Sequence, residues 1–257
     1  MSIAQPPVPT TPRPRLFRFA APPNFVMLAS RLAPWLAALA AVAGVAGLAV
    51  GFLVAPTDAQ QGEAYRIIYV HVPAAWLSML IYLAMAFWAA VGFIYNTRVS
   101  SVMACALAPT GALFTFLALW TGALWGKPTW GTWWVWDARL TSELILLFLY
   151  VGFMALHASF DDVRRADRAA AILAIVGIVN VPIIYFSVKW WNTLHQGASI
   201  RLTEAPSMAT PMLVGLMLMT VSFWAYAAAI TLKRARCIVL EREYAADWTR
   251  SGKEHAS

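Results

Sequence analysis

The residues in this sequence best suited to binding chemistry are a short run of tryptophans and two of the four histidines. Aromatic rings provide flat apolar surfaces, and an imidazole nitrogen can ligate zinc, copper or iron. A tryptophan run can also be an aromatic belt at a membrane surface. Glycine and proline interrupt this run and charged residues follow it directly, which favours a ligand or partner surface. The five tryptophans are Trp125, Trp130, Trp133, Trp134 and Trp136.

The residues around the run have more than one interpretation. If residues 130–137 are helical, Trp130, Trp133 and Trp134 share a face with Asp137, at spacings of three and four. The pattern then predicts an aromatic platform edged by charge. Asp137 also precedes an apolar run and could simply cap the helix there. Arg139 could be an ordinary rim charge, or could pair with an acidic group of a ligand.

These residues can act together only if the chain brings them to one place, and its composition indicates how. Hydrophobic residues make up 61% of the chain and charged residues only 12%. That is about half the charge of an ordinary soluble domain. A helix that spans a hydrocarbon core of about 30 Å needs about 20 mainly apolar residues. Six stretches approach or exceed this length, at 36–54, 74–95, 103–124, 144–158, 169–188 and 210–232.

We therefore predict an all-α membrane protein with six transmembrane helices. The six-helix domain covers residues 34–232 and includes an outer tryptophan-rich loop at 125–143. It is flanked by tails at 1–33 and 233–257, which are charged and lack apolar periodicity.

The positions of the basic residues predict the orientation of the six spans. A net charge of +7 would raise nucleic acid as a partner of a soluble chain. Here 14 of the 19 lysines and arginines lie in the two tails or in the loops after spans two and four. Basic residues are enriched on the cytoplasmic side, so both termini are predicted to be cytoplasmic. The charge is then a feature of a protein in a lipid bilayer, and no nucleic acid is expected.

This topology separates the histidines. His71 lies at the outer mouth of span two and His195 in the third outer loop, on the side of the tryptophans, whereas His157 and His255 are cytoplasmic. A zinc site would need further ligands that the outer loops do not clearly supply. Haem needs only axial ligands, because its porphyrin provides four nitrogens. Two histidines beside an aromatic surface, with basic residues near, therefore indicate a haem-like ligand.

Three segments carry a resemblance to a known family. The run WGKPTWGTWWVWDARLTSE at 125–143 resembles the tryptophan-rich WWD signature of the haem-handling proteins of cytochrome c maturation. The segments YVHVPAAW at 69–76 and KWWNTLHQ at 189–196 are similar to the histidine segments of the CcmC, or haem exporter protein C, family. The resemblance runs from the first span to the sixth, and only about the first 30 residues lie outside it.

The resemblance implies a protein of the bacterial inner membrane with its working loops in the periplasm. It implies haem b at the tryptophan-rich region, with His71 and His195 as axial ligands, and the periplasmic haem chaperone CcmE as acceptor. It also implies association with the ATP-binding cassette subunits CcmA and CcmB and with the small membrane protein CcmD. Because the sequence has no P-loop, ATP hydrolysis is expected from a partner. We expect a haem-delivery protein without a catalytic residue.

Two other functions remain as alternatives. A haem lyase of the same superfamily would attach haem to apocytochrome, but such proteins are usually larger and carry additional membrane histidines. A transporter would carry haem or another solute through the six helices. The spans contain Asn180 but no clear relay of charged residues, which a polar pathway usually needs. Pro109 and Pro182 are expected to kink spans three and five.

Overall fold

A computed structural model describes residues 21–191, 193, 195 and 208–244, and this part of the chain is helical. Six helical segments are long and apolar enough to cross a membrane, which confirms the predicted all-α, six-span fold. No strand is formed among the described residues. The elements are α1 (Pro22–Ala49), the π-helical η2 (Val50–Val54), the 3-10 helix η3 (Glu63–Ile67), α2 (Ile68–Tyr95), α3 (Arg98–Trp130), α4 (Ala138–Ala158), α5 (Val163–Gly177), α6 (Asn180–Trp190) and α7 (Thr210–Arg242).

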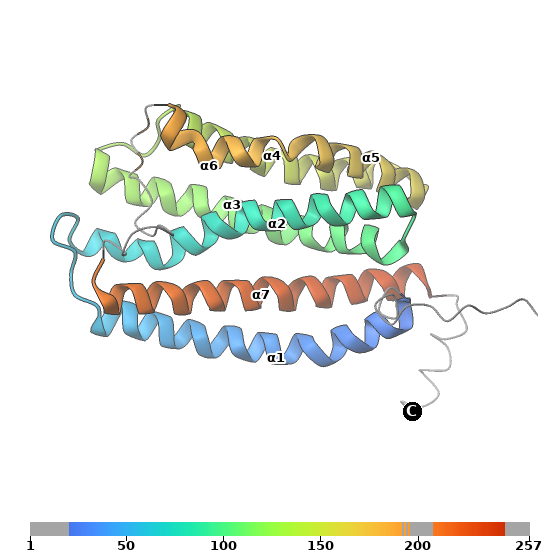
Figure 1. Cartoon of the computed structure of the whole chain (residues 1–257), viewed down its shortest axis with the longest axis horizontal. Helices are drawn as coiled ribbons and strands as arrows, with labels where there is room; N and C mark the ends of the chain where they lie inside the picture. Colours follow the sequence, from blue (N-terminus) through green and yellow to red (C-terminus); the bar gives the residue numbers. More distant parts are fainter. Residues whose placement is uncertain (1–20, 192, 194, 196–207, 245–257) are drawn as a thin grey trace, which may run out of the picture.

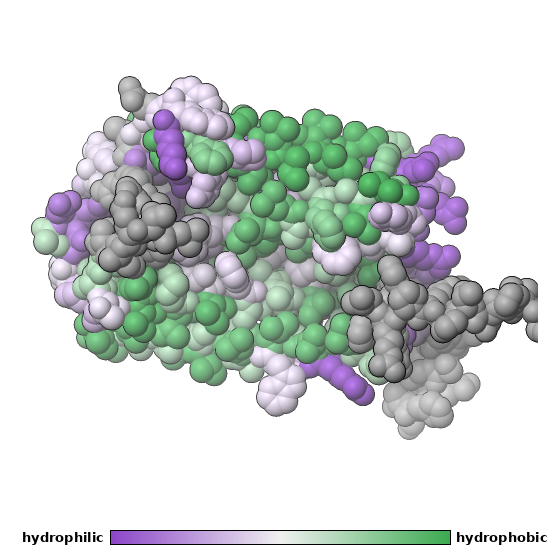
Figure 2. All heavy atoms as spheres, in the orientation of Figure 1, coloured by the Kyte–Doolittle hydropathy of each residue, from purple (hydrophilic) through white to green (hydrophobic). Residues whose placement is uncertain are grey.

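The helices lie side by side along the long axis of the molecule (Figure 1). The helix α1 packs along α7, and α2 packs along α3. The helices α4, α5 and α6 cover the side of the α2–α3 pair that faces away from α1. Hydrophilic residues gather at the two ends of the bundle, with an apolar band between them (Figure 2). This distribution suits a protein whose middle lies in hydrocarbon and whose ends lie in water.

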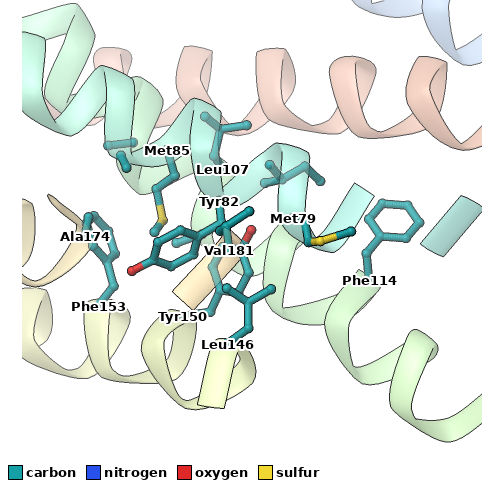
Figure 3. Packing of buried hydrophobic residues seen from close by; sticks show 14 of the residues in the cluster. Met79, Tyr82, Met85, Leu107, Phe114, Leu146, Tyr150, Phe153, Ala174 and Val181 are labelled. Carbon is teal, nitrogen blue, oxygen red and sulfur yellow. The ribbon is translucent and has the colours of Figure 1, made fainter. Parts of the chain in front are cut away.

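Aromatic side chains packed against glycine hold α2, α3, α4 and α5 together. The rings of Tyr82 and Tyr150 meet edge to face in the centre of the core (Figure 3), with centroids 5.1 Å apart. A Cβ atom at Gly111 would lie 2.1 Å from the Tyr150 ring, and one at Gly177 would lie 2.1 Å from the Tyr82 hydroxyl. The Tyr150 hydroxyl donates to the Ser78 carbonyl at 2.8 Å. Glycine therefore gives these helices the close approach on which packing in a membrane depends.

The fifth span is interrupted, as its proline predicts. The helix α5 ends at Gly177 and α6 begins at Asn180, two residues before Pro182. Pro182 has no N–H to donate to the Ile178 carbonyl, and the N–H of Val181 bonds to that carbonyl instead, at 3.1 Å. By contrast, α3 continues through Pro109 without interruption. The Asn180 amide donates to the Ser142 carbonyl of α4 at 2.8 Å, so the polar residue noted at membrane depth joins two helices.

The helices extend beyond the apolar stretches that predicted them. The helix α1 begins at Pro22, within the segment expected to be a tail, and α7 continues to Arg242. The helix α3 continues to Trp130, so Trp125 and Trp130 belong to a helix and the loop proper is 131–137. Hydropathy marks the length that lies in hydrocarbon, whereas a helix continues until a capping residue ends it.

Successive spanning helices run in opposite directions, so the loops that connect them lie at the two ends of the bundle. The end that contains the start of α2 and the α3–α4 loop is called the histidine end. The end that contains the start of α1, the α2–α3 and α4–α5 loops and the end of α7 is called the arginine end. The loops with the basic residues thus fall together, as predicted. Which end faces the cytoplasm stays a prediction from charge.

Reporter fusions test this orientation. Fusions after Arg98, Arg165 and Arg236 should report a cytoplasmic position, because the basic residues gather there. Fusions after Gly62 and Thr132 should report an external position, measured with a reporter active only outside the cytoplasm. An intracellular signal at Thr132 would contradict the orientation and would place the tryptophan loop in the wrong compartment.

Candidate functional site

His71 lies in the first turn of α2 and rests directly against α3. Its Nδ1 atom is 3.0 Å from the hydroxyl oxygen of Thr121. Its ring meets the Trp125 ring edge to face, with centroids 5.6 Å apart and planes at 81°. A Cβ atom at Gly122 would lie 3.0 Å from His71 Cε1. The glycine therefore leaves the space in which the imidazole touches the helix.

The hydroxyl of Thr121 determines which nitrogen of His71 carries the proton. This hydroxyl donates its single hydrogen to the Leu117 carbonyl at 2.5 Å. Its oxygen is then the acceptor for the contact with His71, so Nδ1 of His71 must be the donor. The opposite nitrogen, Nε2, keeps its lone pair and is the atom available to a metal. A histidine that ligates a metal usually donates its other ring N–H to an oxygen of the protein in this way.

His195 follows α6 and reaches the same part of the molecule. The centroid of its ring lies 5.1 Å from that of Trp130, which is the last residue of α3. Its Nδ1 atom is 3.6 Å from Asp137 Oδ2, slightly beyond hydrogen-bonding distance. Both atoms are buried without a hydrogen-bond partner among the described residues. Burial and the nearby Arg139 guanidinium lower the pKa of His195 to about 4, so its ring is neutral at neutral pH and can ligate a metal.

Asp137 serves α4 and faces His195 at the same time. Its Oδ1 atom accepts a hydrogen bond from the Leu140 N–H at 2.8 Å, so the residue is the N-cap of α4. The capping interpretation is confirmed, and the same geometry directs the second oxygen toward His195. One carboxylate therefore starts a helix and supplies negative charge beside an imidazole.

The helix through residues 130–137 that would place the tryptophans on one face is not formed. Gly131 has a φ of 78° and closes α3 with its N–H on the Lys127 carbonyl at 3.0 Å. The chain then runs without helical structure until Asp137 caps α4. A left-handed glycine is a common end to a helix, so the single aromatic face cannot form.

The tryptophans instead form two groups. Trp125 and Trp130 lie on the last turns of α3, and each contacts one of the two histidines. In the loop, the rings of Trp134 and Trp136 meet edge to face at 5.3 Å. Trp136 is 77% exposed, whereas Trp134 Nε1 is buried without a hydrogen-bond partner among the described residues; Trp133 is 54% exposed. The loop therefore offers aromatic surface to a ligand or a partner.

Arg139 lies in the first turn of α4, within electrostatic range of both histidines. The residue is half-buried in this region, and its guanidinium can pair with an acidic group of a ligand. The structure thus brings together the predicted site residues His71, His195, Trp125, Trp130, Asp137 and Arg139.

Several residues near the site were not identified from the sequence. Besides Thr121 and Gly122, Gln61 accepts a hydrogen bond from Trp125 Nε1 at 2.7 Å, and the Tyr65 ring lies 5.7 Å from that of Trp125. A helical reading of α3 would have found Thr121, because it precedes Trp125 by four residues and so shares its face. The contact from Gln61 has no such signal, because it joins a loop to a distant helix.

The arrangement suits a metal ion that is already coordinated by an organic ligand and needs only one or two further ligands from the protein. In the described part of the chain, His71 contacts Thr121 and His195 faces Asp137 through Nδ1. The one group of three metal-type side chains found there, Cys105, His157 and Asp167, lies in another part of the molecule. These groups suit an iron porphyrin. Imidazoles can take the axial positions of the iron, aromatic rings can cover the flat macrocycle, and a guanidinium can pair with the carboxylates of the ligand.

Comparison with known proteins gives consistent matches over most of the chain. The family model described as CcmC, heme exporter protein C, matches residues 15–250. The heme exporter protein C of Escherichia coli K12 is 49% identical over 235 residues, which cover 91% of this chain and 94% of that protein. The Haemophilus influenzae protein of the same name is 48% identical over 92% of this chain and 96% of its own length. A putative cytochrome c biosynthesis ccmC-like mitochondrial protein of Marchantia polymorpha is 47% identical over 73% and 79%.

Replacement of Thr121 by valine tests the role of its hydroxyl. Valine keeps the shape but removes the acceptor for His71 Nδ1, so the imidazole tautomer is no longer fixed. We expect haem affinity to fall about 10- to 100-fold, the usual cost of removing the hydrogen-bond partner of a metal-ligating histidine. Nitrogen NMR of histidine-labelled protein should show a changed tautomer at His71 even without haem.

Thr115→Val is the matched control. Thr115 is a buried threonine of α3 that donates to the Gly111 carbonyl at 2.8 Å, like Thr121 to its own helix, but it has no histidine partner in the described structure. Equal losses in the two variants, with an unchanged His71 signal, would show that the effect is structural.

Proposed function

The chain belongs to the CcmC, or heme exporter protein C, family, and we propose that it binds haem b at the histidine end and delivers it to the periplasmic chaperone CcmE. The observation that carries this proposal is the geometry of two imidazoles from separate segments. Each packs on a tryptophan of α3, and each directs Nδ1 toward a protein oxygen. That arrangement leaves Nε2 for iron on both rings.

In the proposed complex, His71 and His195 ligate the iron from opposite faces of the porphyrin. Trp130, Trp134 and Trp136 cover the macrocycle, because aromatic rings stack on flat apolar ligands. Arg139 pairs with a propionate, which a guanidinium can bind through two hydrogen bonds. The buried Trp134 Nε1, which lacks a partner among the described residues, supports a polar ligand atom in this region.

Delivery requires that part of the haem stay accessible while it is held. The strong exposure of Trp133 and Trp136 supports a face of the site that a second protein can approach. Iron ligation then retains the haem, and the loop at 131–137 presents one edge of it to CcmE. Asp137, which joins the loop to α4, contributes charge to this docking step.

The proposed setting is the bacterial inner membrane, with the histidine end in the periplasm. CcmA and CcmB would supply ATP hydrolysis and CcmD would be a further membrane partner, while this chain acts as a haem carrier without catalysing a reaction. The haem-lyase and transporter alternatives have less support. The amide of Asn180, the polar group noted in the spans, is used to join α6 to α4.

Replacement of either ligand by glycine tests the haem site. His71→Gly and His195→Gly should each weaken haem retention and leave an open iron position that added imidazole can fill. The absorption spectrum of purified protein, with and without imidazole, measures both effects. His157→Ala is the histidine control and should leave the spectrum nearly unchanged.

His157 makes an ion pair with Asp167 at 2.9 Å, so the amount of folded protein must be measured for that control as well. Unchanged spectra in both glycine variants would contradict the ligand assignment.

Two replacements of Asp137 separate docking from helix capping. Asparagine caps a helix about as well as aspartate, whereas alanine loses about 1 kcal/mol of capping stability. If charge at this position guides transfer, both variants should keep appreciable haem and both should transfer it poorly to CcmE. Bound haem and chaperone-linked haem are measured in the same membranes. Normal transfer by Asp137→Asn with poor transfer by Asp137→Ala would assign the residue to capping alone.

A further inference from the structure

A cavity of about 770 Å³ opens at the arginine end, at the other end of the bundle from the histidine site. This volume is within the range of about 300 to 1,000 Å³ that is typical of small-molecule pockets. It is formed by the ends of five helices, namely the start of α1, the end of α2, the first turns of α3 and α5, and the end of α7. The haem proposal assigns no role to it.

The lining of the cavity is strongly positive. Five arginines face two carboxylates, a net formal charge of +3. Both carboxylates are already paired. Asp167 accepts from two nitrogens of Arg242, at 2.9 and 3.0 Å, and Glu243 pairs with Arg98 at 2.7 Å.

The arginines of the cavity that form no ion pair in the described structure belong to α5. Arg164, Arg165 and Arg168 line the cavity, and none has a carboxylate within ion-pair range in the described structure. Arg168 also lies over the ring of Phe93, with 5.8 Å from its guanidinium carbon to the ring centroid. Three guanidinium groups beside the N-terminus of α3 form a site suited to an anion, because both kinds of group carry donors and positive charge. The N-terminus of α5 is already capped by the Asp162 carboxylate, which accepts from the Arg165 N–H at 2.8 Å.

The other walls of the cavity are apolar. Val102 and Val239 are almost fully buried in its floor, and Phe93 and Val163 are exposed at its side. The cavity therefore joins a cationic rim to a hydrocarbon-like wall at the boundary of the membrane-spanning region. A free inorganic anion would use only the rim, whereas a lipid with an anionic headgroup would use both surfaces.

We propose that this cavity binds an anionic phospholipid, with the phosphodiester on the α5 arginines and an acyl chain along the exposed side chains of Phe93 and Val163. Guanidinium groups bind phosphate through paired hydrogen bonds, and basic pockets between helices at the cytoplasmic side are suited to such headgroups. The predicted orientation places the cavity in the leaflet where anionic lipid faces the cytoplasm. The proposal does not rest on haem binding.

Native mass spectrometry of the purified full-length chain tests the proposal. The protein is mixed with equal amounts of phosphatidylglycerol and phosphatidylcholine that carry the same acyl chains. We expect the first bound lipid to be phosphatidylglycerol by about ten-fold, since each basic residue near a headgroup contributes measurable attraction. Equal binding of the two lipids by the unmodified chain would overturn the proposal without any variant.

Paired substitutions locate the binding site. Arg164→Gln with Arg168→Gln removes two charges from one face of α5 and should reduce the preference to less than about two-fold. Arg234→Gln with Arg236→Gln removes the same charge from exposed positions on α7 outside the cavity and should keep the preference. Equal loss in both pairs would indicate diffuse surface attraction instead. Displacement of the lipid by inorganic phosphate would assign the cavity to a free anion.

Discussion

The interior of a bilayer offers no water, so each polar group at that depth must find its partner within the protein. The described helices meet much of this constraint with hydrogen bonds from side chains to carbonyls, whereas the hydroxyls of Tyr82 and Thr231 are buried without a hydrogen-bond partner among the described residues. Tyr150 donates to Ser78, and Ser222 of α7 donates to the Ala40 carbonyl of α1 at 2.7 Å. The contact between Thr121 and His71 joins two side chains and likewise links two helices. A bond that satisfies a polar side chain in the bundle also sets the chemistry of the site.

The histidine end combines groups of different rigidity. His71 is held within a pair of long helices, whereas His195 follows the end of α6 and depends on Trp130 and Asp137 for its position. Asp137 is fixed by its bond to the first turn of α4. In the proposed haem complex, such a site holds one ligand of the iron firmly and the other less firmly, which suits the proposed retention and later release of haem. Burial, together with the charge of Arg139, favours the neutral form of the His195 imidazole.

Much of the fold could be predicted because membrane spans follow from length and hydropathy. The break before Pro182 could be predicted because proline has no N–H to donate within a helix. The contact of both histidines with tryptophans could be predicted because successive loops alternate between the two ends of the bundle. The helical platform failed at Gly131, because a repeat of aromatic residues does not reveal a left-handed backbone. Thr121 was missed because the apolar stretch that predicted the third span ends before Trp125, whereas in the longer helix α3 Thr121 lies one turn before Trp125 on the same face. Its importance arises from Leu117, which takes its hydrogen and leaves an acceptor.

Trp125 and Trp130 both belong to α3, and this has a geometric consequence. Five residues of one α-helix separate the two ring contacts, which corresponds to a rise of about 7.5 Å and a rotation of about 140°. Helical pitch therefore sets the offset between the two histidine contacts, independently of the loops that carry the rest of the site. A family member with one residue inserted between these tryptophans would turn the second ring by about 100° away from its histidine. This interval is therefore expected to tolerate changes of side chain but not of length.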